Sequence, residues 1–440
     1  MDIMEILGLN AGDAADTEPD DRDPRFVVEG TDAVRIRIIR EDKDFDDDRK
    51  DFKPEMCHQF FGERETIFGY SDVKISLFYS ATTLDICYTD CKTEMSTDKT
   101  VPEEEIEEVD DVQKLVLQQM PPNYQVSLNL DEFRARVAKQ AEETHPKPVG
   151  ELIHSFRVTK DDLTRNINVY YVETVTPAFK ELILRAMSLS LWFIDASWYL
   201  DVDDEKWDYF IVYEVEKTSV GTPVHYFIGY ATTYPYYAYP EHVRPRIGHI
   251  LVFPPFQRMG IGVELLQAIY RTYMLKNNVL DITVEDPSEN FTKLRDYVDC
   301  LNCMTLDSFA PDKLKRGFTS ELASEAQKKL KIPKKQCRRV YEILRLKDID
   351  MKQAEEFKRY RLEVKRRLNI PFQNRRSYLQ QIQSSLTDQE KAAALAVNLS
   401  AEQRIAILDE TFNKLVLEYR HIVERLSQGP PRNFLPLSTF

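Results

Sequence analysis

Glycine, cysteine and long apolar runs are scarce in this chain. Its 440 residues include 13 glycines and six cysteines, which argues against a disulfide framework and favours a reducing compartment. No apolar run approaches the roughly 18 to 20 residues needed to cross a bilayer. The first residues are acidic, unlike a secretory leader. These absences predict a soluble intracellular protein, and the length allows two or three domains.

Negative charge is concentrated in the first three quarters of the chain. The whole sequence has a net charge of −15. Residues 313–440 contain 27 Lys and Arg against 15 Asp and Glu, a net charge of +12, so residues 1–312 carry −27. An acidic body attracts basic ligands and repels nucleic acid, so direct binding of nucleic acid is not expected. Solvated helix faces would explain the basic charge of the C-terminal region, although that region could also contact a polyanion.

Composition and periodicity divide the chain into four regions. Residues 1–23 are rich in Asp and are predicted to lack fixed structure. Residues 24–145 combine strand-like segments with a helical pattern, and residues 146–312 alternate strands with helices. Residues 313–440 are helical in pattern. The sequence therefore predicts an α+β protein with a mixed N-terminal domain, a central mixed sheet flanked by helices, and a basic helical C-terminal domain.

Two capping boxes mark helix starts in the C-terminal region. Thr387 precedes Glu390 by three residues, and Ser400 precedes Gln403 by the same spacing. In such a pair each side chain accepts a hydrogen bond from the other residue's backbone amide.

The central region has a clear order of elements. Strand-like segments occur at residues 167–173, 207–216 and 225–239, and a helical pattern occurs at 177–190. The last two strands are separated by a segment with Gly and Pro that suits a hairpin connection. A further apolar strand at residues 278–287 ends in two acidic residues.

A strand, a glycine-containing turn and a helix follow one another in "HILVFPPFQRMGIGVELLQAIY". Residues 250–253 form a short apolar strand, which the prolines 254 and 255 end because they lack a backbone donor. Apolar residues then recur at helical spacing from Gly260 onward. The first amides of a helix are unpaired and favour an anion, and glycines at 260 and 262 leave the approach open. A tight turn without a ligand would show the same pattern.

The spacing of Gln257, Gly260 and Gly262 indicates which class of phosphate-containing ligand the turn would bind. It matches neither the nucleotide-triphosphate loop nor the dinucleotide motif G-x-G-x-x-G. It resembles the [RQ]-x-x-G-x-[GA] signature of GNAT acetyltransferases, whose loop holds the pyrophosphate of acetyl-CoA. That resemblance implies two strands that splay apart on either side of the helix, with the pantetheine arm between them.

Two carboxylates end the strand that follows this helix. Val279, Ile282 and Val284 are apolar, and Glu285 and Asp286 come directly after them. A lysine side chain has an unperturbed pKa of about 10.4, so it must lose a proton before its nitrogen can attack a thioester. A partly desolvated carboxylate at the strand end is suited to accept that proton.

Five blocks together resemble the catalytic subunit of type B histone acetyltransferases. They are "WFIDASWYLDVDDEKWDYF", "YPYYAYPEHVRPRI", "FQRMGIG", "VLDITVEDPS" and "RRVYEILRL". The similarity spans roughly residues 24–350. It implies a GNAT acetyltransferase core at 146–312, and an N-terminal domain at 24–145 that contacts the histone.

The resemblance also implies site residues. Glu285 would be the general base, with Asp286 beside it as a second acid, and Asp195 stands where relatives carry a longer Glu. The implied acetyl-CoA contacts are Ile250, Leu251, Val252, Gln257, Arg258, Met259, Gly260, Ile261, Gly262, Val263 and Ser288, although Arg258 and Met259 depart from the glycine-rich turn of the family. The substrate contacts would be Glu63 and Glu65 of "FFGERETIFGY", together with Tyr234, Tyr236 and Tyr237. Aromatic walls suit the aliphatic stem of lysine, but an aromatic sheet core would explain the tyrosines as well.

The implied reaction is acetyl transfer from acetyl-CoA to lysines in the N-terminal tail of newly synthesised histone H4, by direct attack in a ternary complex. The implied partners are histone H4 with histone H3 and a WD-repeat histone-binding subunit. No membrane association is expected. The implied compartments are the nucleus and the cytoplasm. One alternative is a non-catalytic acidic histone chaperone with an acetyltransferase-like fold. A third is an acetyltransferase for small amines or protein N-termini.

Metal sites find little support in the sequence. Cys300 and Cys303 form a C-x-x-C pair, but no histidine pairs with them at the spacing of a zinc site. Buried thiols are the preferred interpretation of the cysteines. The acidic segment 201–205 lacks the glycine and final Glu of a calcium loop. No metal is expected.

The run "KKLKIPKKQCRR" at residues 328–339 has the density of a nuclear import signal or a polyanion contact. A plain helix face would have the same composition.

Overall fold

The computed structural model describes residues 22–94, 109–142, 147–350, 353–374 and 400–437. The described residues form two compact units. The first contains residues up to 289 together with the C-terminal segment from 431, and the second lies between 290 and 430. The predicted unstructured N-terminus and the capping box at Thr387 lie outside the described residues. None of the described helices has the length and apolar character needed to cross a membrane.

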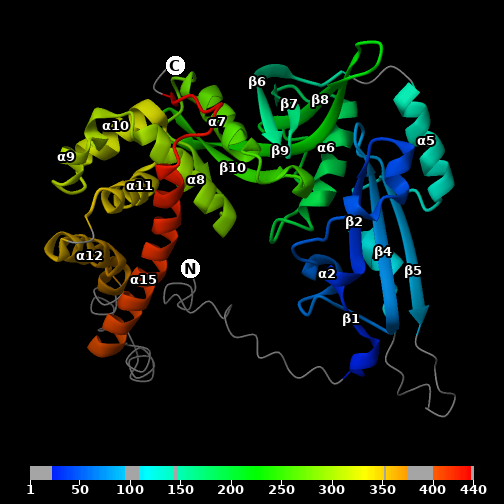
Figure 1. Cartoon of the computed structure of the whole chain (residues 1–440), viewed down its shortest axis with the longest axis horizontal. Coiled ribbons are helices and arrows are strands. Elements are labelled where there is room, and N and C mark those ends of the chain that lie inside the picture. The colour runs from blue at the N-terminus through cyan, green and yellow to red at the C-terminus, as the bar shows by residue number, and fades with distance from the viewer. Residues whose placement is uncertain (1–21, 95–108, 143–146, 351–352, 375–399, 438–440) are drawn as a thin grey trace. The chain divides into compact units, whose positions relative to one another are not determined.

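The N-terminal part of the first unit has a mixed three-stranded sheet of order β2-β4-β5 (Figure 1). β2 and β4 are parallel, and β4 and β5 are antiparallel. The helix α5 packs on this sheet because Phe133 and Val137, at helical spacing, contact Phe45, Phe78 and Cys87. A second small sheet pairs β1 with β3. The elements of this part are η1 (Pro24–Phe26), β1 (Val27–Glu29), α2 (Gly30–Ala33), β2 (Val34–Ile39), η2 (Asp42–Asp46), η3 (Asp48–Lys50), α3 (His58–Phe61), β3 (Thr66–Phe68), β4 (Tyr70–Ser80), β5 (Ile86–Glu94), α4 (Val112–Gln118) and α5 (Leu130–Glu142).

The central part of the first unit is a six-stranded sheet of order β11-β10-β9-β8-β7-β6. All neighbours are antiparallel except β10 and β11, which are parallel. The predicted strands at 167–173, 207–216 and 225–239 and the helix at 177–190 are confirmed. The elements are β6 (Glu151–Lys160), β7 (Leu163–Val172), α6 (Pro177–Ser190), β8 (Asp208–Lys217), β9 (Pro223–Ala238), β10 (His242–Val252), η5 (Pro254–Phe256), α7 (Ile261–Met274) and β11 (Thr283–Val284).

Two strand predictions need correction. The strand before the glycine turn begins at His242 rather than at residue 250, because Pro245 and Gly248 interrupt its first part and are residues that sequence rules keep out of strand interiors. The strand at 278–287 is only two residues long as β11. It is short because the backbone from Asn278 pairs with β10 only intermittently, through a bridge between Val243 and Val279 and then at the end of the segment.

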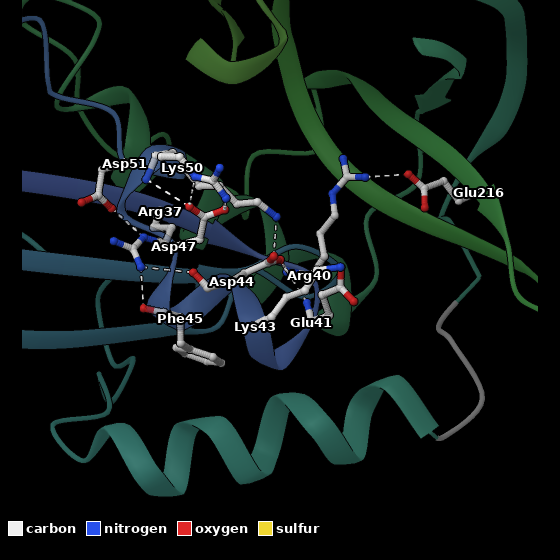
Figure 2. Close-up of polar contacts among 11 residues, drawn as sticks. Arg37, Arg40, Glu41, Lys43, Asp44, Phe45, Asp47, Lys50, Asp51 and Glu216 are labelled. Carbon is white, nitrogen blue, oxygen red and sulfur yellow. Dashed lines mark hydrogen bonds and ion pairs between the residues drawn. The ribbon is translucent and has the colours of Figure 1, made fainter.

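Polar contacts join the N-terminal sheet to the central sheet. Arg40, just after β2, forms an ion pair with Glu214 of β8. It forms a second ion pair with Glu216 of the same strand (Figure 2). Glu214 is buried and also accepts a hydrogen bond from Arg165. The ring of Phe60 stacks on Trp192 with centroids 3.5 Å apart. The N-terminal residues are therefore held against the segment that follows α6.

The second unit is helical, as predicted. Its elements are α8 (Glu289–Cys303), η6 (Asp307–Phe309), α9 (Pro311–Leu314), α10 (Ser320–Leu330), α11 (Lys334–Lys347), α12 (Ala354–Leu368) and α15 (Ala401–Ser427). Ser400 and Gln403 form the predicted capping box at the start of α15. Glu342 of α11 is buried and accepts hydrogen bonds from Arg367 and from the hydroxyl of Tyr419. The hydrogen bonds to Glu342 therefore link α11, α12 and α15.

Candidate active site

β10 loses its partner on one edge halfway along its length. On the β9 side it is paired from His242 to Val252, with an irregularity after Ile247. On the β11 side its sheet pairing ends at Ile247, opposite Val284. Beyond this point no described strand covers that edge, so the two parallel strands form a fork.

The open edge of β10 presents backbone groups of alternate residues. The amide of Phe253 donates to the carbonyl of Ile228 in β9, at 2.9 Å. Because amides alternate in direction along a strand, those of Ile250 and Val252 face the opposite, open edge. Leu251 faces β9 and its side chain is buried. Among these three predicted acetyl-CoA contacts, Ile250 and Val252 therefore carry the available donors.

The glycine turn follows at the end of β10. Gly260 has a φ of 85° and stands as the N-cap of α7. A Cβ added there would meet open space. The amides of residues 258–262 have no acceptor in the described part of the chain, whereas Val263 donates to the carbonyl of Gly260. Several free donors therefore converge at a helix N-terminus, where an anion is stabilised.

The other residues of the turn have structural roles. The side chain of Gln257 donates to the carbonyl of Val252 at 2.9 Å, which fixes the turn to the end of the strand. The side chains of Ile261 and Val263 are buried in the core. Arg258 is exposed with a φ of 62°, and Met259 is half-buried. The predicted contacts from this set are thus mainly those of the backbone.

Glu285 lies at the fork. Its amide donates to the carbonyl of Ile247, the last paired residue of β10, at 3.0 Å. Its side chain is 34% exposed, and one carboxylate oxygen lies 3.8 Å from a guanidinium nitrogen of Arg246. Asp286 and Ser288 are exposed, and Asp286 has a φ of 28°. Of the two predicted acids at the strand end, Glu285 is the one anchored beside the open edge.

Asp195 and Glu65, which are 130 positions apart in the sequence, meet through a histidine. His58 Nε2 lies 3.2 Å from Asp195 Oδ1, and His58 Nδ1 lies 3.5 Å from Glu65 Oε1. Glu65 also accepts hydrogen bonds from the amides of Cys57 and His58, so it caps α3. Glu63 is exposed. The prediction missed His58, which lies two residues before the motif "FFGERETIFGY" and seven residues before Glu65.

The predicted tyrosines divide between the two faces of β9. The rings of Tyr234 and Tyr236 have centroids 5.0 Å apart, and Tyr234 packs edge-on against Trp207 at 4.9 Å. The guanidinium of Arg246 lies 4.3 Å from the ring centroid of Tyr236. Tyr237 points to the other face of the strand and is largely exposed. Arg246 therefore connects an aromatic surface to the carboxylate of Glu285.

A buried histidine occupies the irregular part of β10. His249 Nδ1 lies 3.3 Å from the Tyr230 hydroxyl, and its Nε2 lies 3.5 Å from Ser197 Oγ. Burial lowers the pKa of His249 to about 4, so the ring is neutral at pH 7. The exposed Trp198 packs edge-on against it. Sequence reasoning did not single out His249, because its two partners, Tyr230 and Ser197, lie 19 and 52 positions away in the sequence.

The cysteines and the acidic segment 201–205 show ordinary structural contacts. Burial raises the pKa of the thiols of Cys300 and Cys303, which leaves them protonated and unreactive. Cys91 is exposed, so the prediction of buried thiols is wrong for that residue because it lies near the outer end of β5. Asp204 accepts a hydrogen bond from the hydroxyl of Tyr234. Across the described residues, no group of three acidic, histidine or cysteine side chains is placed to hold a metal.

Three known protein families match parts of this chain between residues 26 and 346. The family described as "Histone acetyl transferase HAT1 N-terminus" matches residues 26–195, and the GNAT acetyltransferase family matches residues 177–294. The family "Histone acetyltransferase type B catalytic subunit, C-terminal" matches residues 295–346. The predicted domain limits at 145 and 312 stay predictions.

Curated relatives agree with these matches. The histone acetyltransferase type B catalytic subunits of Rattus norvegicus and Homo sapiens are each 36% identical over 401 residues, which covers 90% of this chain and 92% of each relative. The corresponding subunit of Cryptococcus neoformans is 29% identical over 406 residues, covering 84% of this chain and 89% of the relative. The GNAT match implies use of acetyl-CoA, and the protein is a lysine acetyltransferase. The chain belongs to the family of histone acetyltransferase type B catalytic subunits.

Proposed function

We propose that this enzyme acetylates lysines in the N-terminal tail of newly synthesised histone H4, by direct attack of the lysine amine on the thioester of acetyl-CoA. The observation that carries the proposal is the fork between β10 and β11. It combines open backbone donors at Ile250 and Val252 with the carboxylate of Glu285 beside the last paired residue.

Glu285 accepts the proton of the attacking amine, directly or through one water. The amine nitrogen forms a bond to the acetyl carbon, the carbon–sulfur bond breaks, and the thiolate of coenzyme A leaves. The chain's contribution is to hold a base within reach and to keep the amine neutral. Arg246, next to Glu285 and over Tyr236, disfavours a charged amine at that position.

Backbone amides provide the complementary donors. Those of Ile250 and Val252 are oriented to stabilise the thioester oxygen as negative charge develops on it. The free amides of residues 258–262, with the open approach at Gly260, fit a pyrophosphate. Leu251, Ile261 and Val263 support this geometry from the core.

Charge and aromatic surface favour a basic peptide as the acceptor. Residues 1–312 carry a net charge of −27, which favours association with a basic tail. Tyr234, Tyr236 and Trp207 form an aromatic surface for the aliphatic part of the lysine side chain. The cluster of Asp195, His58 and Glu65 contributes two carboxylates. Asp286 and Glu63 add exposed negative charge.

The proposed partners are histone H3, bound together with histone H4, and a WD-repeat histone-binding subunit. The proposed compartments are the nucleus and the cytoplasm. Family membership sets aside the non-catalytic chaperone. Acetylation of small amines or protein N-termini remains a rival choice of substrate, and the acidic charge argues against it because a small amine gains little from an extended acidic surface.

Transfer of labelled acetyl groups to four acceptors tests the substrate. They are an H4 tail peptide, the same peptide with every lysine replaced by arginine, an H4 peptide with a blocked N-terminus, and spermidine. We expect transfer to the first and third only. Transfer to the lysine-free peptide or to spermidine at a comparable kcat/KM would contradict the proposal.

A further inference from the structure

A basic cavity in the helical unit has no part in the proposed reaction. Its volume is about 820 Å³, within the range of small-molecule sites. Five cationic side chains and one carboxylate line it: Lys334, Lys335, Arg338, Arg366, Arg367 and Glu363. They converge from two helices, α11 and α12. None of the residues assigned to the candidate active site contributes to it.

Acidic side chains fix two of the arginines that line the cavity, and one of these acids, Glu342, is buried. Arg338 bonds to Glu342 and Glu363, and its guanidinium lies 4.9 Å from the ring centroid of Phe318. Arg367 forms two hydrogen bonds to Glu342. Their positions are therefore preorganised, and their charges are partly balanced.

The remaining cations have no such balance. Lys334, Lys335 and Arg366 are exposed and have no ion pair to a described residue. The two lysines occupy the first turn of α11, which has no acidic residue and no side-chain cap. Positive charge is unfavourable at this end of a helix dipole. The amides of residues 334–336 also lack an acceptor in the described part of the chain.

We propose that this cavity binds a compact, multiply phosphorylated small molecule. Phosphate groups would accept hydrogen bonds from the α11 amides and from Lys334, Lys335 and Arg366, and the fixed guanidiniums of Arg338 and Arg367 add positive charge to the lining. A concave site with converging cations suits several charges on a small scaffold better than the spaced charges of an extended acidic peptide or a DNA duplex. The run at 328–339 is then a polyanion contact rather than a plain helix face.

Isothermal titration of the full chain with myo-inositol hexakisphosphate tests the cavity, at physiological salt so that diffuse attraction is screened. We expect saturable binding to one site. K334A/K335A should weaken it at least tenfold, and R366A, on the other helix, several-fold. The matched control K313A/K328A removes two exposed lysines outside the cavity and should change affinity less than twofold.

Titrations with three further ligands show which class of anion the cavity binds. Coenzyme A should bind with the same affinity in wild type and in K334A/K335A, and poly-glutamate and a short DNA duplex should bind more weakly than the hexakisphosphate. No saturable binding of the hexakisphosphate, or an equal loss in both double variants, would overturn the proposal. Tighter binding of poly-glutamate or DNA that K334A/K335A abolishes would replace the small molecule by a macromolecule. Loss of coenzyme A affinity in that variant would assign the cavity to the co-substrate.

Discussion

Two glutamates, one in each unit, are held in opposite ways. Glu342 in the helical unit has no exposed side-chain surface and accepts hydrogen bonds from Arg338, Arg367 and Tyr419. Glu285 at the fork is 34% exposed, and one of its carboxylate oxygens lies 3.8 Å from a guanidinium nitrogen of Arg246. A carboxylate whose lone pairs are all engaged stabilises the fold but is a poor proton acceptor. A carboxylate that is anchored through its backbone and has a half-buried side chain with one loose ion pair can accept a proton.

Removing the charge of Glu342 should have the largest effect on stability. Glu342→Gln leaves two arginines facing a neutral group, and breaking a buried ion pair costs about 3–5 kcal/mol. We expect a loss of about 3 kcal/mol, because both arginines are partly exposed. Thermal unfolding followed by circular dichroism would measure it. The control Glu410→Gln, in an exposed pair on α15, should not shift the transition detectably.

The buried His249 should make the sheet unit sensitive to acid. Burial lowers its pKa from 6.5 to about 4, so the unfolded chain binds a proton first and stability falls as the pH drops from about 6.5 toward 4. From these values His249 removes about 2 kcal/mol between pH 7 and pH 5. His249→Gln should reduce this loss, as measured by denaturant unfolding with tryptophan fluorescence. A variant with the acid response of the wild type would contradict the assignment.

The open approach at Gly260 should matter for acetyl-CoA affinity. Gly260→Ala adds a Cβ in the space left for the pyrophosphate, at a φ that disfavours side chains, and the KM for acetyl-CoA should rise about tenfold, or about 1.4 kcal/mol. Gly317→Ala is the matched control, since Gly317 has a φ of 100° and equally open space. Similar losses in both variants would point to backbone strain rather than to the anion site.

Arg246 should have the smallest effect. Removing its charge makes the protonated form of the bound amine more favourable, because a nearby cation disfavours that form. Arg246→Gln should therefore shift the acidic limb of the kcat profile to higher pH, with a rate loss of a few-fold at pH 7. An unchanged pH profile would show that Arg246 does not act on the protonation of the amine.

The sequence predicted the parts of the site that depend on local chemistry. The glycine turn, the start of α7 and the acids after Val284 are encoded by neighbouring residues, so they were found directly. The cluster of His58, Glu65 and Asp195 could not be found in this way, because it forms only when distant segments pack together.

Irregular pairing explains the remaining differences. β10 was predicted too short and β11 too long, because periodicity records which side chains are buried and not which strand edges are paired. The fork itself is therefore invisible in composition and came from the resemblance. Similarly, Glu264 and Gln267 are polar residues of a helix that prove to be buried, where Glu264 contacts His154 and Gln267 contacts the carbonyl of Leu435.

The most direct test of the central claim is acetyl transfer to the H4 tail peptide by wild type and Glu285→Gln across a pH series, with the exposed Glu173→Gln as control. We predict a loss of at least a hundredfold at pH 7 that partly recovers at high pH, where the amine is already neutral, and no change in the control. If Glu285→Gln matches the wild type at every pH, Glu285 is not the base, and Asp286 or Asp195 takes its place.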